Sequence, residues 1–194
     1  FFDKYNKQKR TFEAVTEQLS QTRAEIDHLE SISTSMDIAR LEEDLVQIKE
    51  ELTEYGYIRR HYSGGKKVKI TSRPYHYLSS DGFHIYVGKN NYQNEEVTFK
   101  IANGNDWWFH AKGIPGSHVV VRTEGKELPD RTFEEAAALA AWYSKGRDND
   151  KVEIDYIQRK HVKKAAGGAP GFVIYHTNYS LMAEPRLMLQ EVTG

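Results

Sequence analysis

The sequence of 194 residues predicts an α+β protein, in which an antiparallel helical coiled-coil hairpin precedes a compact mixed α/β domain. Two patterns predict this fold class. Apolar residues recur at spacings of three and four over the first 56 residues, as they do on helices that pack along a narrow stripe. Short β-rich runs, separated by glycine, proline and asparagine turns, begin at residue 75. No apolar run approaches the ~20 residues needed to cross a bilayer, so we expect no membrane span.

Two heptad-like runs predict the helices of the hairpin. The first is Phe12, Val15, Leu19, Ile26 and Leu29, and the second is Ile38, Leu41, Leu45, Ile48, Leu52 and Tyr55. The runs are out of phase, because the first register, if continued, would bury Arg40 and Glu43. We therefore predict a break at residues 31–35, where Thr34 caps a new helix and Asp37 completes a capping box. Gly56 then ends the second helix.

The predicted helices differ in length. Residues 2–32 would span ~46 Å and residues 38–55 ~27 Å, at ~1.5 Å per residue. The overhang of the first helix carries Phe1, Phe2 and Tyr5. We expect these aromatic rings to contact another part of a longer parent chain, since this chain does not start with Met, or a second copy of the protein. Self-association through the coiled coil is one of these two alternatives.

Charge changes sign along the chain. Residues 1–56 carry 7 Lys/Arg against 13 Asp/Glu, whereas residues 57–194 carry 20 against 15. We divide the chain into a coiled-coil hairpin (1–56), a basic linker (57–74) and an α+β domain (75–194). The linker contains Arg59, Arg60, Lys66 and Lys67 among tyrosines. Such a mixture suits nucleic acid, because cations neutralise phosphates and rings stack on bases; a solvated hinge is the alternative.

The α+β domain is expected to contain six strands and two helices. The strands are predicted at residues 75–78, 83–87, 107–111, 118–122, 152–156 and 172–175. Helices are predicted at 93–101 and at 132–144. We expect Thr132 to cap the second helix, with Glu135 at the third position completing a capping box.

A chemically dense segment lies between residues 106 and 118. Its candidate site residues are Asp106, Trp108, His110, Pro115, Gly116, Ser117 and His118. A hydrolase is disfavoured, because the G-x-S-x-G elbow is missing and adjacent Ser117 and His118 would point to opposite faces of a strand. The absence of cysteine and of an HExxH pair disfavours a metal site. We expect no catalytic residue, metal or cofactor here; the alternatives are a buried, hydrogen-bonded histidine or an RNA contact.

A cationic segment follows the last predicted long strand. Arg159, Lys160, Lys163 and Lys164 stand within six residues and run into a glycine-rich loop at 165–171. Backbone of this kind approaches an anionic surface closely. The order of a P-loop is missing, so nucleotide hydrolysis is not expected. The alternative is a solvated charged loop.

Four segments together resemble the NFACT-R domain of the NFACT family, of the bacterial RqcH and fibronectin-binding-protein type. They are residues 81–95, 106–121, 132–144 and 156–175, and the resemblance extends over about residues 75–185. The preceding coiled coil resembles the end of the family's middle segment. The family's characteristic positions fall on the seven candidate residues between 106 and 118, and on Arg159, Val162, Lys163, Lys164, Pro170 and Gly171.

The resemblance implies a noncatalytic RNA-binding module of a ribosome quality control factor. Such a factor binds RNA of the stalled large ribosomal subunit together with tRNA in the cytoplasm, and supports alanine tailing of nascent chains. The alternative that the resemblance implies is a fibronectin-binding adhesin at the cell surface. Two departures from the family's pattern stand out: Trp107 replaces an aliphatic residue, and Ala165 and Ala166 replace a more basic stretch.

Overall fold

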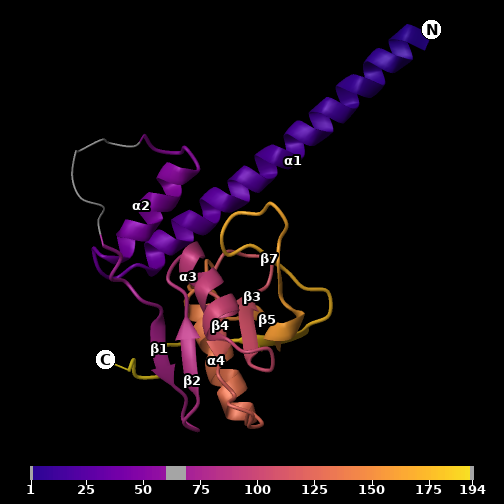
Figure 1. The fold of residues 1–194 in the computed structure, drawn as a ribbon. Helices are drawn as coiled ribbons and strands as arrows, with labels where there is room; N and C mark the ends of the chain where they lie inside the picture. The colour runs from indigo at the N-terminus through magenta and orange to yellow at the C-terminus, as the bar shows by residue number, and fades with distance from the viewer. Residues whose placement is uncertain (1, 60–68, 193–194) are drawn as a thin grey trace.

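A long helix, α1 (Phe2–Ile38), leads the chain and projects away from the rest of the molecule (Figure 1). The computed structural model describes residues 2–59 and 69–192. Helix α2 (Asp44–Glu54) turns back along the C-terminal end of α1, so that Glu51 of α2 contacts His28 of α1. The predicted antiparallel helical hairpin and the α+β fold class are therefore confirmed.

The break between the helices lies at residues 39–43 and not at 31–35. Thr34, the expected cap of a new helix, instead donates to the carbonyl oxygen of Glu30 one turn earlier in α1 at 3.0 Å, and Ser35 likewise donates to Ser31 at 2.9 Å. Both side chains are buried. Small residues here allow the end of α1 to pack closely on the domain. The carboxylate of Asp44 accepts the backbone N–H of Arg40 and starts α2.

The heptad stripe of α1 is exposed. Phe12 is 72% and Leu19 50% exposed, and Val15, Ile26 and Leu29 are exposed as well. Helix α2 is 11 residues long and pairs with the last part of α1, from about His28 onwards. The overhang is therefore longer than the sequence predicts, because α2 is shorter than expected and starts six residues later.

Six antiparallel strands form the main sheet of the domain, in the order β1-β2-β4-β3-β5-β8. They are β1 (Tyr75–Leu78), β2 (His84–Val87), β3 (Trp107–Ala111), β4 (Val119–Val121), β5 (Val152–Gln158) and β8 (Tyr179–Ala183). A separate hairpin joins β6 (Lys163–Lys164) to β7 (Val173–Ile174). The sequence pattern missed β8, an edge strand whose side chains are mostly exposed.

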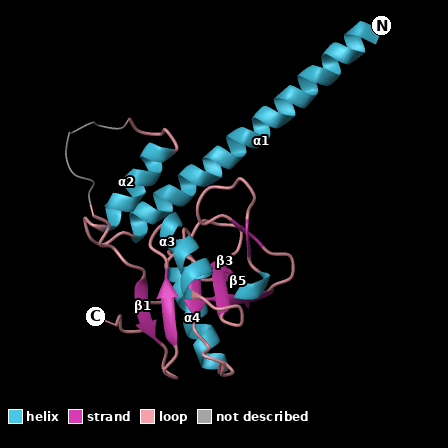
Figure 2. Cartoon of the chain, viewed as in Figure 1, coloured by secondary structure: helices cyan, strands magenta, loops and turns pink. Residues whose placement is uncertain are grey.

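Helices cover both faces of the sheet (Figures 1 and 2). Helix α4 (Asp130–Trp142) packs on Phe109 and its neighbours through a row of alanines. On the other face, α3 (Asn91–Glu96) continues into the π-helical segment η1 (Val97–Ile101), which packs on Trp108 and Val120. The expected helix at 93–101 is thus two segments. None of the described helices has the length and apolar character that a membrane span requires.

The expected capping box of the second helix is wrong. Helix α4 begins at Asp130, and Thr132 lies inside its first turn. The Thr132 hydroxyl donates to Asp81 at 2.8 Å, and the Glu135 carboxylate accepts the backbone N–H of Ser80 at 2.9 Å. Both side chains therefore hold the turn between β1 and β2, because these polar groups are buried and need partners.

Buried polar side chains join the hairpin to the domain. Asn90 donates to Gln47 at 3.0 Å, and Asn91 donates to Glu51 at 2.8 Å. Gln93, which is fully buried, also donates to Gln47, at 2.9 Å. Hydrogen bonds have narrow distance and angle ranges. This joint therefore sets one orientation of the end of α1 and of α2 on the domain.

Candidate nucleic-acid interface

Asp106 organises the turn that precedes β3. Its buried carboxylate accepts the backbone N–H groups of Asn103 at 2.7 Å and of Thr123 at 2.8 Å. It also pairs with Arg122, whose Nε lies 2.8 Å from Oδ2. The backbone carbonyl of Asp106 in turn accepts the N–H of Arg159 at 2.8 Å. Asp106 thus positions the backbone of Arg159, the first cation of residues 159–164.

Trp108, His110 and His118 form a ring cluster beneath η1. Trp108 is fully buried; it stacks on His110 with ring centroids 5.7 Å apart, and meets the edge of His118 at 5.1 Å. Burial lowers the pKa of His110 to about 4 and that of His118 well below its usual value. Both imidazoles are therefore neutral at pH 7 and supply no charge for phosphate. Their geometry is that of packing groups.

Pro115, Gly116 and Ser117 tie β4 to the end of α4. The Ser117 hydroxyl is buried and donates to the carbonyl of Gly88 at 2.5 Å, and its N–H donates to Tyr143 at 2.8 Å. The carbonyl of Pro115 accepts the N–H of Lys145 at 2.9 Å. Asp106 lies at the opposite end of β3 from these residues. Of the other six candidate residues, two lie within β3 and four lie between β3 and β4, so the structure separates Asp106 from them.

Arg159 and Lys160 are presented by the short 3₁₀ helix η2 (Arg159–His161) at the end of β5. The Arg159 guanidinium donates from Nε to the carbonyl of Thr98 at 2.7 Å and lies 4.8 Å from the centre of the Phe99 ring. The exposed Lys160 donates its backbone N–H to Gly104 at 2.9 Å. Both cations therefore extend from a backbone held against the 103–106 turn.

Lys163 and Lys164 form strand β6, directly after η2. Both are exposed. Lys164 pairs with Glu95, with Nζ and Oε1 2.8 Å apart, so its charge is partly neutralised. We call Arg159, Lys160, Lys163 and Lys164 the cationic strip. Its members share one short stretch of chain, and Arg159 and Lys164 both contact the α3–η1 segment.

The loop of the β6–β7 hairpin packs against α1 and against the start of α3. Gly171 has φ +78°, and a Cβ there would lie 2.9 Å from the carbonyl oxygen of Asn91, so this close approach requires glycine. The Phe172 ring meets His28 of α1, with centroids 6.1 Å apart. His28 Nδ1 also lies 3.2 Å from the hydroxyl of Tyr57, two residues before the exposed Arg59. Arg59 thus follows Tyr57, which contacts His28 beside the β6–β7 hairpin. Arg60, Lys66 and Lys67 lie outside the described residues.

Two polar residues beside the strip, Asn105 and Gln158, carry no recognisable signal in the sequence. Lys160 Nζ lies 3.5 Å from Oδ1 of Asn105, and Gln158 immediately precedes Arg159. Neither amide belongs to a recognisable motif. Only the pairing of Trp107 with Gln158 in the β3–β5 ladder brings the two together.

Two family models cover most of the chain. Residues 73–176 match the NFACT protein RNA binding domain, and residues 1–71 match the NFACT N-terminal and middle domains. A C-terminal structure of the fibronectin/fibrinogen-binding protein from Streptococcus suis superposes with a TM-score of 0.87 at 42% identity. The match covers 95% of this chain and 73% of that one.

Longer relatives share the same region. The chain is 42% identical over 186 residues to the Rqc2 homolog RqcH of Streptococcus suis, and 38% identical over 187 residues to that of Bacillus subtilis. Each match covers 95% of this chain but only 33% and 32% of the relative, respectively. This chain thus spans about a third of the length of these relatives. This chain belongs to the NFACT protein family, because NFACT family models match residues 73–176 and residues 1–71.

Proposed function

We propose that this chain is the RNA-contacting part of a ribosome quality control factor. In this proposal the complete protein binds RNA of stalled large ribosomal subunits together with tRNA, in the cytoplasm, and supports alanine tailing of nascent chains. The names of the relatives and the RNA-binding family model support this function. The chain itself acts as a noncatalytic module that grips phosphates.

The observation that carries the proposal is the cationic strip. Four cations within six residues extend from η2 and β6, and Asp106 and Gly104 hold the backbone of η2 in place. A fixed backbone with long charged side chains suits a phosphate chain, because register comes from the backbone and charge from the side chains. We expect Lys160 and Lys163 to contribute most, since Arg159 is engaged by Thr98 and Lys164 by Glu95.

The proposed contribution of the linker rests on its composition. Arg59 is exposed after α2 and adds to the positive charge of the strip. Arg60, Lys66 and Lys67, which lie outside the described residues, are proposed from their charge to contact RNA as well. The ring cluster of Trp108, His110 and His118 is linked to the strip through Thr98, which contacts both His118 and Arg159.

A salt titration tests this function. Binding of a structured ribosomal RNA fragment is measured from 50 to 300 mM salt for the native chain and for a Lys160→Ala/Lys163→Ala variant. Each lost phosphate contact reduces the magnitude of the slope of log K against log salt by about 0.7–0.9. We therefore expect weaker binding and a slope reduced by roughly 1.4–1.8 for two contacts.

A matched control removes the same charge elsewhere. Lys112 and Lys151 are exposed lysines at the end of the β3–β5 pair opposite η2. A Lys112→Ala/Lys151→Ala variant should keep nearly the native slope. If both double variants lose the same affinity and slope, the strip is not the binding surface.

Fibronectin binding is the less favoured alternative, because the longer relatives are named RqcH, whereas the solved Streptococcus suis structure is of a protein named as fibronectin/fibrinogen-binding. An adhesin surface predicts saturable binding to immobilised fibronectin that survives the Lys160→Ala/Lys163→Ala change. Binding at background level in the native chain would dismiss this candidate.

A further inference from the structure

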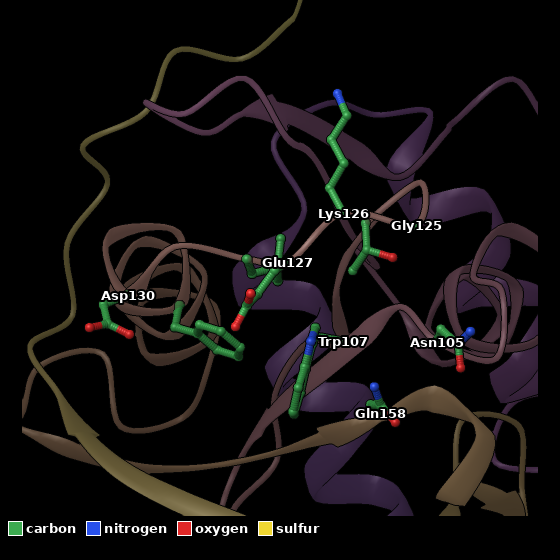
Figure 3. A pocket seen from close by; sticks show the side chains of 10 residues that line it. Asn105, Trp107, Gly125, Lys126, Glu127, Asp130 and Gln158 are labelled. Atoms are coloured by element: carbon green, nitrogen blue, oxygen red, sulfur yellow. The ribbon is translucent and has the colours of Figure 1, made fainter.

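A pocket of about 540 Å³ opens on the α4 face of the sheet, next to η2 (Figure 3). Its lining includes Asn105, Trp107, Glu127, Phe133 and Gln158. We propose that this pocket holds one unpaired nucleobase of the bound RNA, stacked on Trp107, while Lys160 holds the adjoining phosphate. This proposal rests on the proposed function and adds to it a way of selecting single-stranded or looped RNA.

Trp107 supplies the stacking surface. Its ring is half-buried and packs against Phe133, with centroids 4.9 Å apart and ring planes at 75°, and against Tyr156 at 5.8 Å between centroids. Tyr156 stacks in turn on Phe109, which is fully buried in the core. An aromatic ring that is fixed in this way loses little freedom when a base stacks on it, which favours binding.

Polar groups around the ring suit the edge of a base. The amides of Asn105 and Gln158 each offer donors and an acceptor, as the edges of nucleobases do. Glu127 and Asp130 bring carboxylates to the same lining, and Figure 3 shows Asp130 across the pocket from Asn105. Carboxylates repel phosphate but accept hydrogen bonds from base N–H groups. The pocket therefore favours the base and leaves the phosphate outside.

The cationic strip begins at the rim of this pocket. Gln158 lines it, and Arg159 and Lys160 are the next two residues. Lys160 Nζ lies 3.5 Å from the Asn105 side-chain oxygen. A nucleotide whose base stacks on Trp107 thus has a cation beside the mouth of the pocket. In this arrangement Gln158 adjoins the base and Lys160 adjoins the phosphate, and the two residues are only two positions apart.

The test compares two RNA probes and two tryptophan variants. The probes are a single-stranded RNA hexamer and the same hexamer with abasic positions, which keeps every phosphate. Trp107→Leu removes the stacking surface. Trp142→Leu is the matched control, because Trp142 is also half-buried but lies against Arg147, 3.7 Å from ring centre to guanidinium carbon, outside the pocket.

We expect Trp107→Leu to weaken binding of the intact hexamer about tenfold, or about 1.4 kcal/mol, as for the loss of one stacked base. Binding of the abasic hexamer should be the same in Trp107→Leu and native chains, and Trp142→Leu should bind both probes like the native chain. Circular dichroism checks the fold of each variant. As a measurement that needs no stable variant, indole fluorescence of the native chain should be quenched by the intact hexamer and not by the abasic one.

Equal affinities of native and Trp107→Leu chains for the intact hexamer would overturn the pocket proposal, as would an equal loss on the abasic probe or unquenched fluorescence. If structured RNA still binds with the salt slope of the strip in that case, only the pocket is refuted. If the native chain binds no RNA of any kind, both the pocket and the proposed function are refuted.

Discussion

Lys89 and Asp44 form a buried ion pair, with Nζ 2.9 Å from Oδ1, between the loop after β2 and the first residue of α2. The Asp44 carboxylate also accepts the Ser72 hydroxyl at 2.6 Å. Lys89 further lies 4.4 Å from the centre of the Tyr75 ring. The pair thus joins hairpin and domain through two charged side chains that are almost entirely shielded from bulk water.

We expect Asp44→Ala to lower the free energy of unfolding by about 3–5 kcal/mol, because it leaves the Lys89 ammonium buried without its counter-charge. Urea unfolding followed by circular dichroism at pH 7 measures the change. Glu153→Ala is the matched control: it removes an ion pair with Lys112 at 2.7 Å in which both side chains are about half exposed, so a loss of ~0–1 kcal/mol is expected. Similar losses in the two variants would contradict a dominant role for burial.

The close approach at Gly116 predicts a second stability effect. A Cβ at this position would lie 2.9 Å from Cβ of Ser144 and 3.1 Å from the carbonyl oxygen of Tyr143. Gly116→Ala should therefore destabilise the domain by about 1–3 kcal/mol, as overpacking does. Thermal unfolding measures the shift. At Gly104 the nearest atom to an added Cβ is 3.5 Å away, so Gly104→Ala should leave the melting temperature nearly unchanged; a larger effect at Gly104 would refute this explanation.

The buried imidazole of His110 predicts acid sensitivity. Burial lowers its pKa from 6.5 to about 4, so between these values the unfolded chain binds a proton that the folded chain does not. The free energy of unfolding should therefore fall as pH falls from 6.5 to 4, by up to ~3 kcal/mol from this group. In His110→Gln, urea unfolding across this range should show a shallower decline relative to its own value at pH 8. Parallel curves for the two proteins would show that His110 does not carry the effect.

The exposed stripe of α1 predicts self-association. Phe12, Val15 and Leu19 form one apolar line along the projecting helix, and such a line is stabilised when a second helix covers it. Sedimentation equilibrium of this chain should show a monomer–oligomer equilibrium that Leu19→Lys shifts towards monomer. Ala24→Lys adds the same charge on the outward face of the predicted heptad and should have little effect. A native chain that remains monomeric at high concentration would contradict self-association.

Local sequence determined most of the secondary structure. Five of the six strands predicted in residues 75–194 appear in the main sheet, because β-branched and aromatic residues suit the buried, extended backbone of a sheet that helices cover on both faces. The cationic strip was also visible, since four cations in six residues remain close together in any backbone conformation. The resemblance to the NFACT family depended on the same local strings.

Tertiary packing decided where α1 ends. Ser31, Thr34 and Ser35 carry a cap-like pattern, yet they continue the helix because they face the domain, where small side chains permit close contact. Tertiary contacts also explain why Thr132 does not cap α4. Its hydroxyl donates instead to Asp81 in a turn that is distant in the chain. A local sequence pattern shows which hydrogen bonds a side chain is able to make. The tertiary surroundings of that side chain decide which of them forms.

The base-binding pocket shows this division most clearly. Residues 127, 133 and 158 lie far from Trp107 in the chain, and the β3–β5 register and the packing of α4 bring them around it, whereas Asn105 lies two residues before it. The amino-acid sequence by itself determined most of the strands, the presence of the helices and the run of positive charge, because these depend on near neighbours in the chain. The tertiary structure alone decided which distant side chains meet, because contacts between segments depend on how whole elements pack.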